Sequence, residues 1–214
     1  MNTDFLIAKL SAELRPVRAG AVPATLRGGL LAGGVAALVL LVIVPALAVR
    51  PDLQEAAATA PFWMKLAYTV MLGGLGLLGL LAVAKPGEPR PVWKRLLGPA
   101  PLLLAMVVVF TWLTAATPAT SFWMGSSWRV CPLLIAALSL PVLAATLVAL
   151  RRLAPTRLGE AGAAAGLVAG ALAATVYQLH CNESSPGFVL IWYSLGIAIP
   201  AAAGALIGPR VLKW

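Results

Sequence analysis

Two cysteines, with a histidine and a glutamate beside the second, are the residues of this chain best suited to chemistry. The sequence contains two cysteines, Cys131 and Cys181, and one histidine, His180, with Glu183 close by. Thiolate, imidazole and carboxylate groups are ligands for soft and borderline metal ions. Two thiols can instead form a disulfide in an oxidising compartment. We therefore predict that Cys131, Cys181, His180 and Glu183 could together hold a soft metal ion, or that the two cysteines form a bond.

The role of the cysteine pair stays open at this level between a structural disulfide, a redox- or metal-responsive pair, and two unrelated buried thiols. Cys131 precedes Pro132, a favoured first residue of a helix, and Arg129 is near in sequence. Both features favour a thiolate at Cys131. Cys181 would follow the C-terminal end of a helix, where the dipole disfavours negative charge. We therefore expect Cys131 to be the thiolate and Cys181 its partner.

Long apolar stretches must position these residues. Six of them cover residues 28–49, 66–84, 98–116, 130–150, 161–180 and 187–208. Each is long enough to cross a hydrocarbon core of about 30 Å, and 61% of the residues are hydrophobic while 11% are charged. The sequence predicts an all-α polytopic membrane protein with six transmembrane helices. It would consist of an N-terminal segment, 1–27, and a transmembrane domain, 28–214.

Positive charge is concentrated in alternate connections between the stretches. Thirteen of the 16 Lys and Arg residues lie in the N-terminal segment, the second and fourth connections and the C-terminus. The positive-inside rule places these segments, and both termini, in the cytoplasm. The other three are Arg50, Lys65 and Arg129, and we expect Lys65 to snorkel to the outer membrane interface. The net charge of +9 is therefore a signal of topology, not of nucleic-acid binding.

The fourth and fifth stretches should form an antiparallel hairpin. About twenty residues in each direction, at about 1.5 Å per residue, return Cys131 and Cys181 to the same depth on the outer face. Small residues recur every four positions at Gly162, Gly166 and Gly170, a spacing that lets membrane helices pack closely. No charged residue lies near the middle of a predicted span, which disfavours a pump or a proton-coupled transporter.

The N-terminal segment carries a second candidate site, a short amphipathic helix. Its apolar stripe consists of Leu6, Ile7, Leu10 and Leu14, with Val17 just beyond and Pro16 at the expected end. A helix of about three turns is marginal alone, so the stripe needs a surface to cover it. The membrane interface, the underside of the bundle and the groove of a partner protein are the three alternatives.

Several segments, in their order and spacing, carry a resemblance to a known family. They are FLIAKLSAELRPVR at 5–18, RPDL at 50–53, PFWMKLAYT at 61–69, AKPG at 84–87, SSWRVCPLLIAALSLP at 126–141, LRRLAPTRLGEAGAAAG at 150–166, VYQLHCNESSPGFVLIWYSLG at 176–196 and GPRVLKW at 208–214. With them the chain resembles the negative-regulator-of-sigma-F family, whose members are six-helix anti-sigma factors of the bacterial inner membrane.

The resemblance implies a non-enzymatic regulator. The N-terminal leader would hold an extracytoplasmic-function sigma factor at the membrane, away from RNA polymerase, and stress sensed at the periplasmic Cys131 and Cys181 would release it. The residues expected to contact the sigma factor are Leu6, Ile7, Leu10, Leu14, Arg15, Pro16, Val17 and Arg18. The expected partners are this sigma factor and the lipid bilayer, with no nucleic acid.

Two alternatives come from other functional classes. A membrane thiol–disulfide oxidoreductase would use the cysteines, although the sequence has no CxxC pair. A small transporter is disfavoured by the missing charges within the spans. No cofactor is expected beyond a soft metal ion at the periplasmic face. The inducing signal, metal or oxidant, and the oligomeric state stay open.

Overall fold

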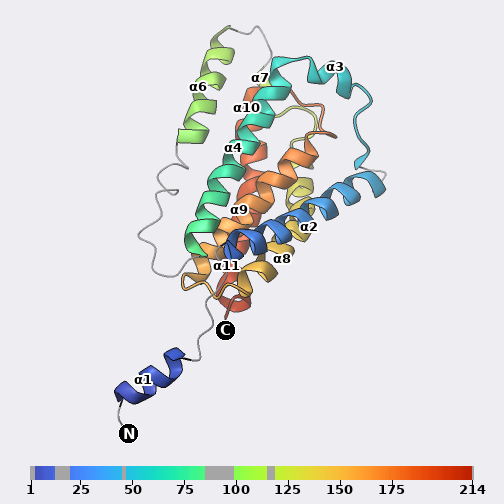
Figure 1. Cartoon of the computed structure of the whole chain (residues 1–214). Helices are drawn as coiled ribbons and strands as arrows, with labels where there is room; N and C mark the ends of the chain where they lie inside the picture. The colour runs from blue at the N-terminus through green and yellow to red at the C-terminus, as the bar shows by residue number, and fades with distance from the viewer. Residues whose placement is uncertain (1–2, 13–19, 45–46, 85–98, 115–118, 214) are drawn as a thin grey trace.

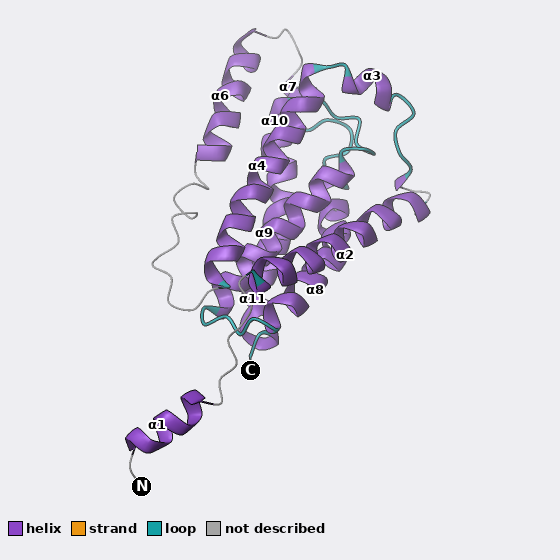
Figure 2. Ribbon diagram, in the orientation of Figure 1, coloured by secondary structure: helices purple, strands orange, loops and turns teal. Residues whose placement is uncertain are grey.

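The computed structural model describes residues 3–12, 20–44, 47–84, 99–114 and 119–213. Within these ranges the regular elements are all helices, without a strand (Figure 2). They are α1 Thr3–Ala12, α2 Ala21–Ile43, α3 Leu53–Ala57, α4 Ala60–Val83, α6 Pro99–Thr114, α7 Ala119–Trp123, α8 Cys131–Arg151, α9 Leu158–Tyr177, α10 Pro186–Phe188, the π-helix η2 Val189–Tyr193 and α11 Ser194–Val211. The all-α fold class predicted from the sequence is confirmed.

Five helical stretches are long and apolar enough to cross a membrane. They are α2, α4, α8, α9 and the continuous run Pro186–Val211 formed by α10, η2 and α11. Helix α6, in the third predicted span, has 16 residues, which is about 24 Å at 1.5 Å per residue. That is shorter than a hydrocarbon core of about 30 Å. The structure thus supports a multi-pass membrane protein, and the sixth span stays a prediction.

Helix α9 is the centre of the bundle and packs on α11, α4 and α8. Its glycines face α11 and allow a very close approach. A Cβ atom added to Gly162 would overlap the Gly204 carbonyl oxygen, and one added to Gly166 would overlap the backbone of Pro200. This confirms the close packing predicted from the four-residue spacing of small residues.

Helix α2 crosses the bundle obliquely and packs on α8, while α6 stands beside α4 (Figure 1). The contact with α8 is again made at a glycine, because a Cβ atom on Gly33 would lie 2.5 Å from the Val142 Cα atom. Leu26, Ala37 and Leu41 are the α2 side chains that are fully buried in the core. Helices α2 and α4 each also contact α9.

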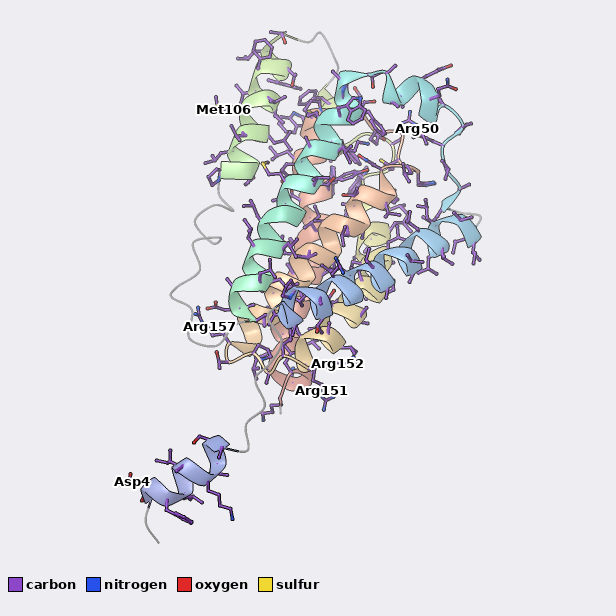
Figure 3. The ribbon with its side chains drawn as sticks, in the orientation of Figure 1. Asp4, Arg50, Met106, Arg151, Arg152 and Arg157 are labelled. Atoms are coloured by element: carbon purple, nitrogen blue, oxygen red, sulfur yellow. The ribbon has the colours of Figure 1, made fainter. Side chains whose placement is uncertain are left out.

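The bundle has two chemically different ends. Arg151, Arg152 and Arg157 lie at the end that carries the C-terminus, whereas Arg50 lies at the opposite end (Figure 3). We call the first the terminal end and the second, which carries α3 and both cysteines, the cysteine end. The separation of positive charge along the sequence is thus also a separation in space. Which end faces the cytoplasm stays a prediction from the positive-inside rule.

Candidate functional site

The hairpin of α8 and α9 brings the two cysteines together at the cysteine end. Cys131 is the first residue of α8. Cys181 follows the last turn of α9, and its backbone N–H donates to the Tyr177 carbonyl oxygen at 3.1 Å. The two residues are 0% and 3% exposed and belong to one core cluster. Both thiols are free, and their side chains interact directly. The common depth predicted from the hairpin is therefore present.

A buried lysine lies against the backbone of this site. Lys65 is 3% exposed. Its Nζ atom donates to the carbonyl oxygen of Glu183 and, at 3.4 Å, to that of Cys181. It also lies 5.1 Å from the centre of the Tyr193 ring. The expectation that Lys65 snorkels to the membrane interface is wrong, because its ammonium group turns inward and donates hydrogen bonds to carbonyl oxygens of the loop after α9.

Arg50 brings a second cation to the same carbonyl group. Its Nη1 atom donates to the Cys181 carbonyl oxygen at 3.3 Å, and its backbone N–H donates to the Leu179 carbonyl oxygen at 2.9 Å. The guanidinium also forms two bonds to the Asp52 carboxylate, at 2.7 and 2.5 Å. These bonds lower the pKa of Asp52 and raise the pKa of Arg50. Arg50 and Asp52 thus tie the segment before α3 to the loop that holds Cys181.

The hydrogen bond within the pair and the nearby lysine favour a thiolate at Cys181. A hydrogen bond from the Cys131 thiol, and then the Lys65 ammonium, lower the pKa of the Cys181 thiol, against the opposite effect of burial. Arg129 does not supply the charge expected for Cys131, because it is exposed and stacks on the Trp128 ring at 4.8 Å. The assignment of the thiolate to Cys131 is therefore corrected.

Aromatic side chains close the site. Tyr177 and Tyr193 are 2% and 0% exposed and stack at a ring distance of 6.1 Å in the cluster that holds both cysteines. Sequence analysis missed these tyrosines, and also Lys65 and Arg50. A lysine inside an apolar helix was the available signal, because such a residue is by default a functional candidate.

The four residues predicted as a metal set do not converge. The His180 Nδ1 atom lies 2.8 Å from the Ala48 carbonyl oxygen. The Glu183 Oε1 atom accepts from the backbone N–H and the hydroxyl of Ser126, at 2.6 and 2.7 Å. Over the described ranges, no three His, Cys, Asp or Glu side chains are grouped as metal ligands. His180 and Glu183 instead form hydrogen bonds with neighbouring loops. Of the four predicted ligands, only the two cysteines lie together.

The predicted leader helix is present as α1, and every one of its residues is exposed. It lies beyond the terminal end of the bundle (Figure 1). Phe5, Ile7 and Leu10 are 72%, 59% and 59% exposed. The underside of the bundle therefore does not cover the apolar stripe in this structure. Five of the residues expected to contact a partner lie outside the described residues: Leu14, Arg15, Pro16, Val17 and Arg18.

Comparison with known proteins adds a further observation. Residues 10–214 match the family described as "Negative regulator of sigma F". A probable anti-sigma-F factor of Azospira oryzae is 40% identical over 215 residues, with 100% of both chains covered. An anti-sigma-F factor of Caulobacter vibrioides is 39% identical over 219 residues, again with 100% of both chains covered. No solved structure matches the chain.

Proposed function

Because the chain belongs to the negative-regulator-of-sigma-F family, we propose that it is a non-enzymatic anti-sigma factor of the bacterial inner membrane. It holds an extracytoplasmic-function sigma factor at the cytoplasmic face and releases it when stress acts on the periplasmic face. The observation that carries this proposal is the similarity to anti-sigma-F factors over the full length of the chain. The terminal end is then cytoplasmic and the cysteine end periplasmic.

Helix α1 is the surface that binds the sigma factor in this proposal. It exposes a stripe of large apolar side chains, Leu6, Ile7 and Leu10, that no described part of the bundle covers. A helix of ten residues is too short to be stable alone in water. An amphipathic helix of this kind gains stability when its apolar face enters a groove on a partner. The leader then continues toward Arg18, along residues that the sequence also assigns to the contact.

Co-purification of the sigma factor with matched variants of α1 tests this contact. Leu10→Glu places a charge in the stripe, and Ser11→Glu places the same charge on a neighbouring exposed face of the helix. Loss of an anchor residue of a small interface costs about 2 kcal/mol or more, which is roughly a thirtyfold loss of affinity. We expect Leu10→Glu to lose the sigma factor and to express its target genes constitutively, with normal membrane levels of the protein.

Retention of the sigma factor by Leu10→Glu at the level of Ser11→Glu would reject α1 as the binding surface. In that case the apolar face of α1 would be buried in the membrane interface instead. Failure of the wild-type protein to retain any sigma factor would reject the anti-sigma function itself.

The cysteine pair is the input of the switch in this proposal. Oxidation of the Cys131 thiol and the Cys181 thiolate to a disulfide forms one S–S bond, releases the Cys131 proton and passes two electrons to an external oxidant. A soft metal ion bridging the two sulfurs would also displace the Cys131 proton. Either event neutralises the negative charge of the Cys181 thiolate, which Lys65 stabilises in the reduced, metal-free pair. It therefore changes the relative free energies of two arrangements of the α8–α9 hairpin.

Induction of sigma-dependent transcription tests this input. We expect Cys131→Ser and Cys181→Ser each to abolish induction, and the double variant to be no worse than either single variant, because the two residues act as one unit. Intact mass and thiol labelling before and after stress distinguish a disulfide from a bound metal. If both serine variants fold, repress and still respond normally to the inducer, the cysteines are structural and the sensor lies elsewhere.

A further inference from the structure

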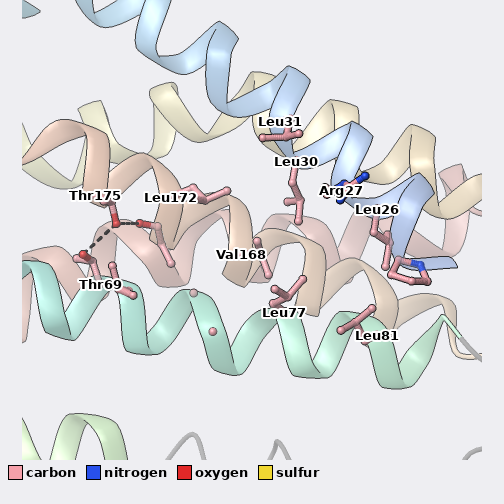
Figure 4. Close-up of a pocket in the computed structure, with 15 residues that line it drawn as sticks. Leu26, Arg27, Leu30, Leu31, Thr69, Leu77, Leu81, Val168, Leu172 and Thr175 are labelled. Atoms are coloured by element: carbon pink, nitrogen blue, oxygen red, sulfur yellow. Dashed lines mark hydrogen bonds between the residues drawn. The ribbon is translucent and has the colours of Figure 1, made fainter. Parts of the chain in front are cut away.

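A long apolar groove runs along the bundle between α2 and α4, with α9 as its floor (Figure 4). It encloses about 570 Å³, within the range of about 300–1,000 Å³ that is typical of ligand sites. The groove exists because α2 and α4 each pack on α9 while α2 crosses the bundle obliquely. Its rim opens on the outer surface of the bundle, where Leu31 and Val70 are 61% and 55% exposed.

The walls of the groove are hydrocarbon along most of its length. The side chains on it include Leu26, Leu30, Leu77, Leu81, Val168 and Leu172. At one end the Thr175 hydroxyl pairs with the Thr69 hydroxyl at 3.0 Å. Both hydroxyls also lie within hydrogen-bonding distance of carbonyl oxygens of their own helices. The polar groups at this end therefore have hydrogen-bond partners within the protein and need none from a ligand. A ligand of the groove therefore needs an apolar body.

The other end of the groove carries a cation. Arg27 lines the groove there, beside Leu26 (Figure 4). It is exposed, it lies in the second turn of α2 at the terminal end, and within the described part of the chain it forms no ion pair. An apolar channel that ends at an unpaired cation is complementary to an amphiphile with a long hydrocarbon chain and a negatively charged head.

We propose that this groove binds an acyl chain of an anionic phospholipid, with the lipid phosphate on Arg27. Lipid is favoured over a soluble ligand because the rim faces the hydrocarbon region of the bilayer. Arg27 lies at the terminal end, where the positive charges of the chain gather and where an anionic headgroup is attracted. The inference goes beyond the proposed function and requires only that the bundle spans a membrane.

Native mass spectrometry of the purified full chain in detergent tests the site, with phosphatidylglycerol and phosphatidylcholine of identical acyl chains as probes. One cation near a lipid surface contributes about a fivefold preference for anionic lipid. We expect one phosphatidylglycerol to stay bound and to raise the melting temperature, with about a fivefold preference over phosphatidylcholine. Inorganic phosphate alone should leave the melting temperature unchanged.

Two pairs of variants separate the chain site from the headgroup site. A Cβ atom on Gly74, which lines the groove, or on Gly34, which does not, would meet no atom within 4 Å. We expect Gly74→Leu to lose the bound lipid and Gly34→Leu to keep it. Arg27→Gln should reduce the preference for phosphatidylglycerol to about one, whereas Arg151→Gln, at the same end, should leave it unchanged.

Three results would overturn the proposal. They are equal retention of lipid by Gly74→Leu and Gly34→Leu, equal binding of the two lipids by the wild type, and a melting temperature that rises with inorganic phosphate alone. Should Gly74→Leu fail to fold, the comparison of Arg27→Gln with Arg151→Gln decides, because both side chains are exposed.

Discussion

At the residue scale, the charge state of the cysteine pair is decided by direct neighbours. A helix N-terminus contributes about 0.3–1 kcal/mol to a nearby anion, which is the effect that the sequence argument assigned to Cys131. A unit charge about 4 Å away contributes roughly 4 kcal/mol at the effective dielectric of a protein site. The buried Lys65 ammonium donates to the Cys181 carbonyl oxygen at 3.4 Å, so a cation lies beside the pair, and the hydrogen bond from the Cys131 thiol lowers the pKa of Cys181 further. The local ion therefore outweighs the helix dipole.

This balance predicts the pH profile of thiol labelling. The lowered pKa of Cys181 keeps it a thiolate, and so reactive, down to a lower pH than an ordinary cysteine. Lys65→Met removes the stabilising charge, so the labelling profile should move to higher pH and the rate at neutral pH should fall several-fold. Lys65→Arg keeps the charge and should retain most of the effect. Mass spectrometry of protein labelled with iodoacetamide over a pH series measures both.

Arg129→Met is the matched control for this experiment. Arg129 is a cation at the same end of the bundle, but it stacks on Trp128. Its removal should leave the profile where it is. If the labelling profile shifted in Arg129→Met but not in Lys65→Met, Arg129 and not Lys65 would be the cation that stabilises the thiolate.

The same lowered pKa has a consequence for stability, with a defined sign. A thiol whose pKa is lower in the folded than in the unfolded state stabilises the fold above its unfolded pKa. This contribution is lost as the pH falls through the folded pKa. The melting temperature of the reduced protein should therefore rise between the folded and the ordinary pKa of the Cys181 thiol. This rise should be smaller in Cys181→Ser.

At the element scale, the loop between α9 and α10, which contains Cys181, connects the cysteine pair to α7 through hydrogen bonds. The Ser185 hydroxyl donates to the Phe122 carbonyl oxygen at 2.6 Å. Gly125 adopts the left-handed region at φ +57°, and a Cβ atom there would lie 2.5 Å from the Glu183 Oε2 atom. A side chain at Gly125 would therefore strain the backbone and displace the carboxylate. Hydrogen bonds of 2.6 to 2.7 Å thus join the loop that follows Cys181 to α7 and to the turn after it.

The interface of α9 and α11 gives a prediction about stability. A Cβ atom on Gly166 would overlap the backbone of Pro200, so Gly166→Ala must push the two helices apart. Overpacking of this kind costs about 1–3 kcal/mol. Gly34→Ala introduces the same methyl group into open space on α2 and should be neutral. Thermal unfolding in detergent micelles compares the two variants. Equal melting temperatures would contradict the prediction, because they would mean that α9 and α11 can move apart without a loss of stability.

At the scale of the whole molecule, the two candidate sites lie at opposite ends of the bundle. Helix α8 has 21 residues, so it separates its ends by about 31 Å at 1.5 Å per residue. The α8–α9 hairpin connects Cys131 and Cys181 directly to the 151–160 connection, where Arg157 pairs with Glu160 at 3.4 Å. A tilt of this hairpin is the most direct route from the cysteines to the terminal end of the bundle.

The proposed orientation predicts the behaviour of reporter fusions. Fusions after Leu53 and Ser184 should report the periplasm, because the ends that they mark carry few Lys or Arg residues. Fusions after Pro89 and Ala154 should report the cytoplasm. A cytoplasmic signal at Ser184 would reverse the assignment of the cysteine end and, with it, the compartment of the proposed sensor.

Much of this architecture could be predicted from the sequence, because it depends on patterns along one dimension. Helix length, the clustering of Lys and Arg and the four-residue spacing of Gly162, Gly166 and Gly170 are such patterns. The meeting of Cys131 with Cys181 follows from the similar lengths of two antiparallel helices, 21 and 20 residues. The exposed stripe of α1 follows from a period of about four residues.

Only the tertiary structure decided which faces of these helices meet. Lys65 could have reached the interface, but the carbonyl groups after α9 turn it inward and place its charge beside Cys181. His180 and Glu183 lie near Cys181 in sequence, yet loops from other parts of the chain take up their side chains. The groove at Arg27 exists because α2 crosses α9 obliquely. Crossing angles and loop paths depend on contacts between distant segments, and no local pattern of residues encodes them.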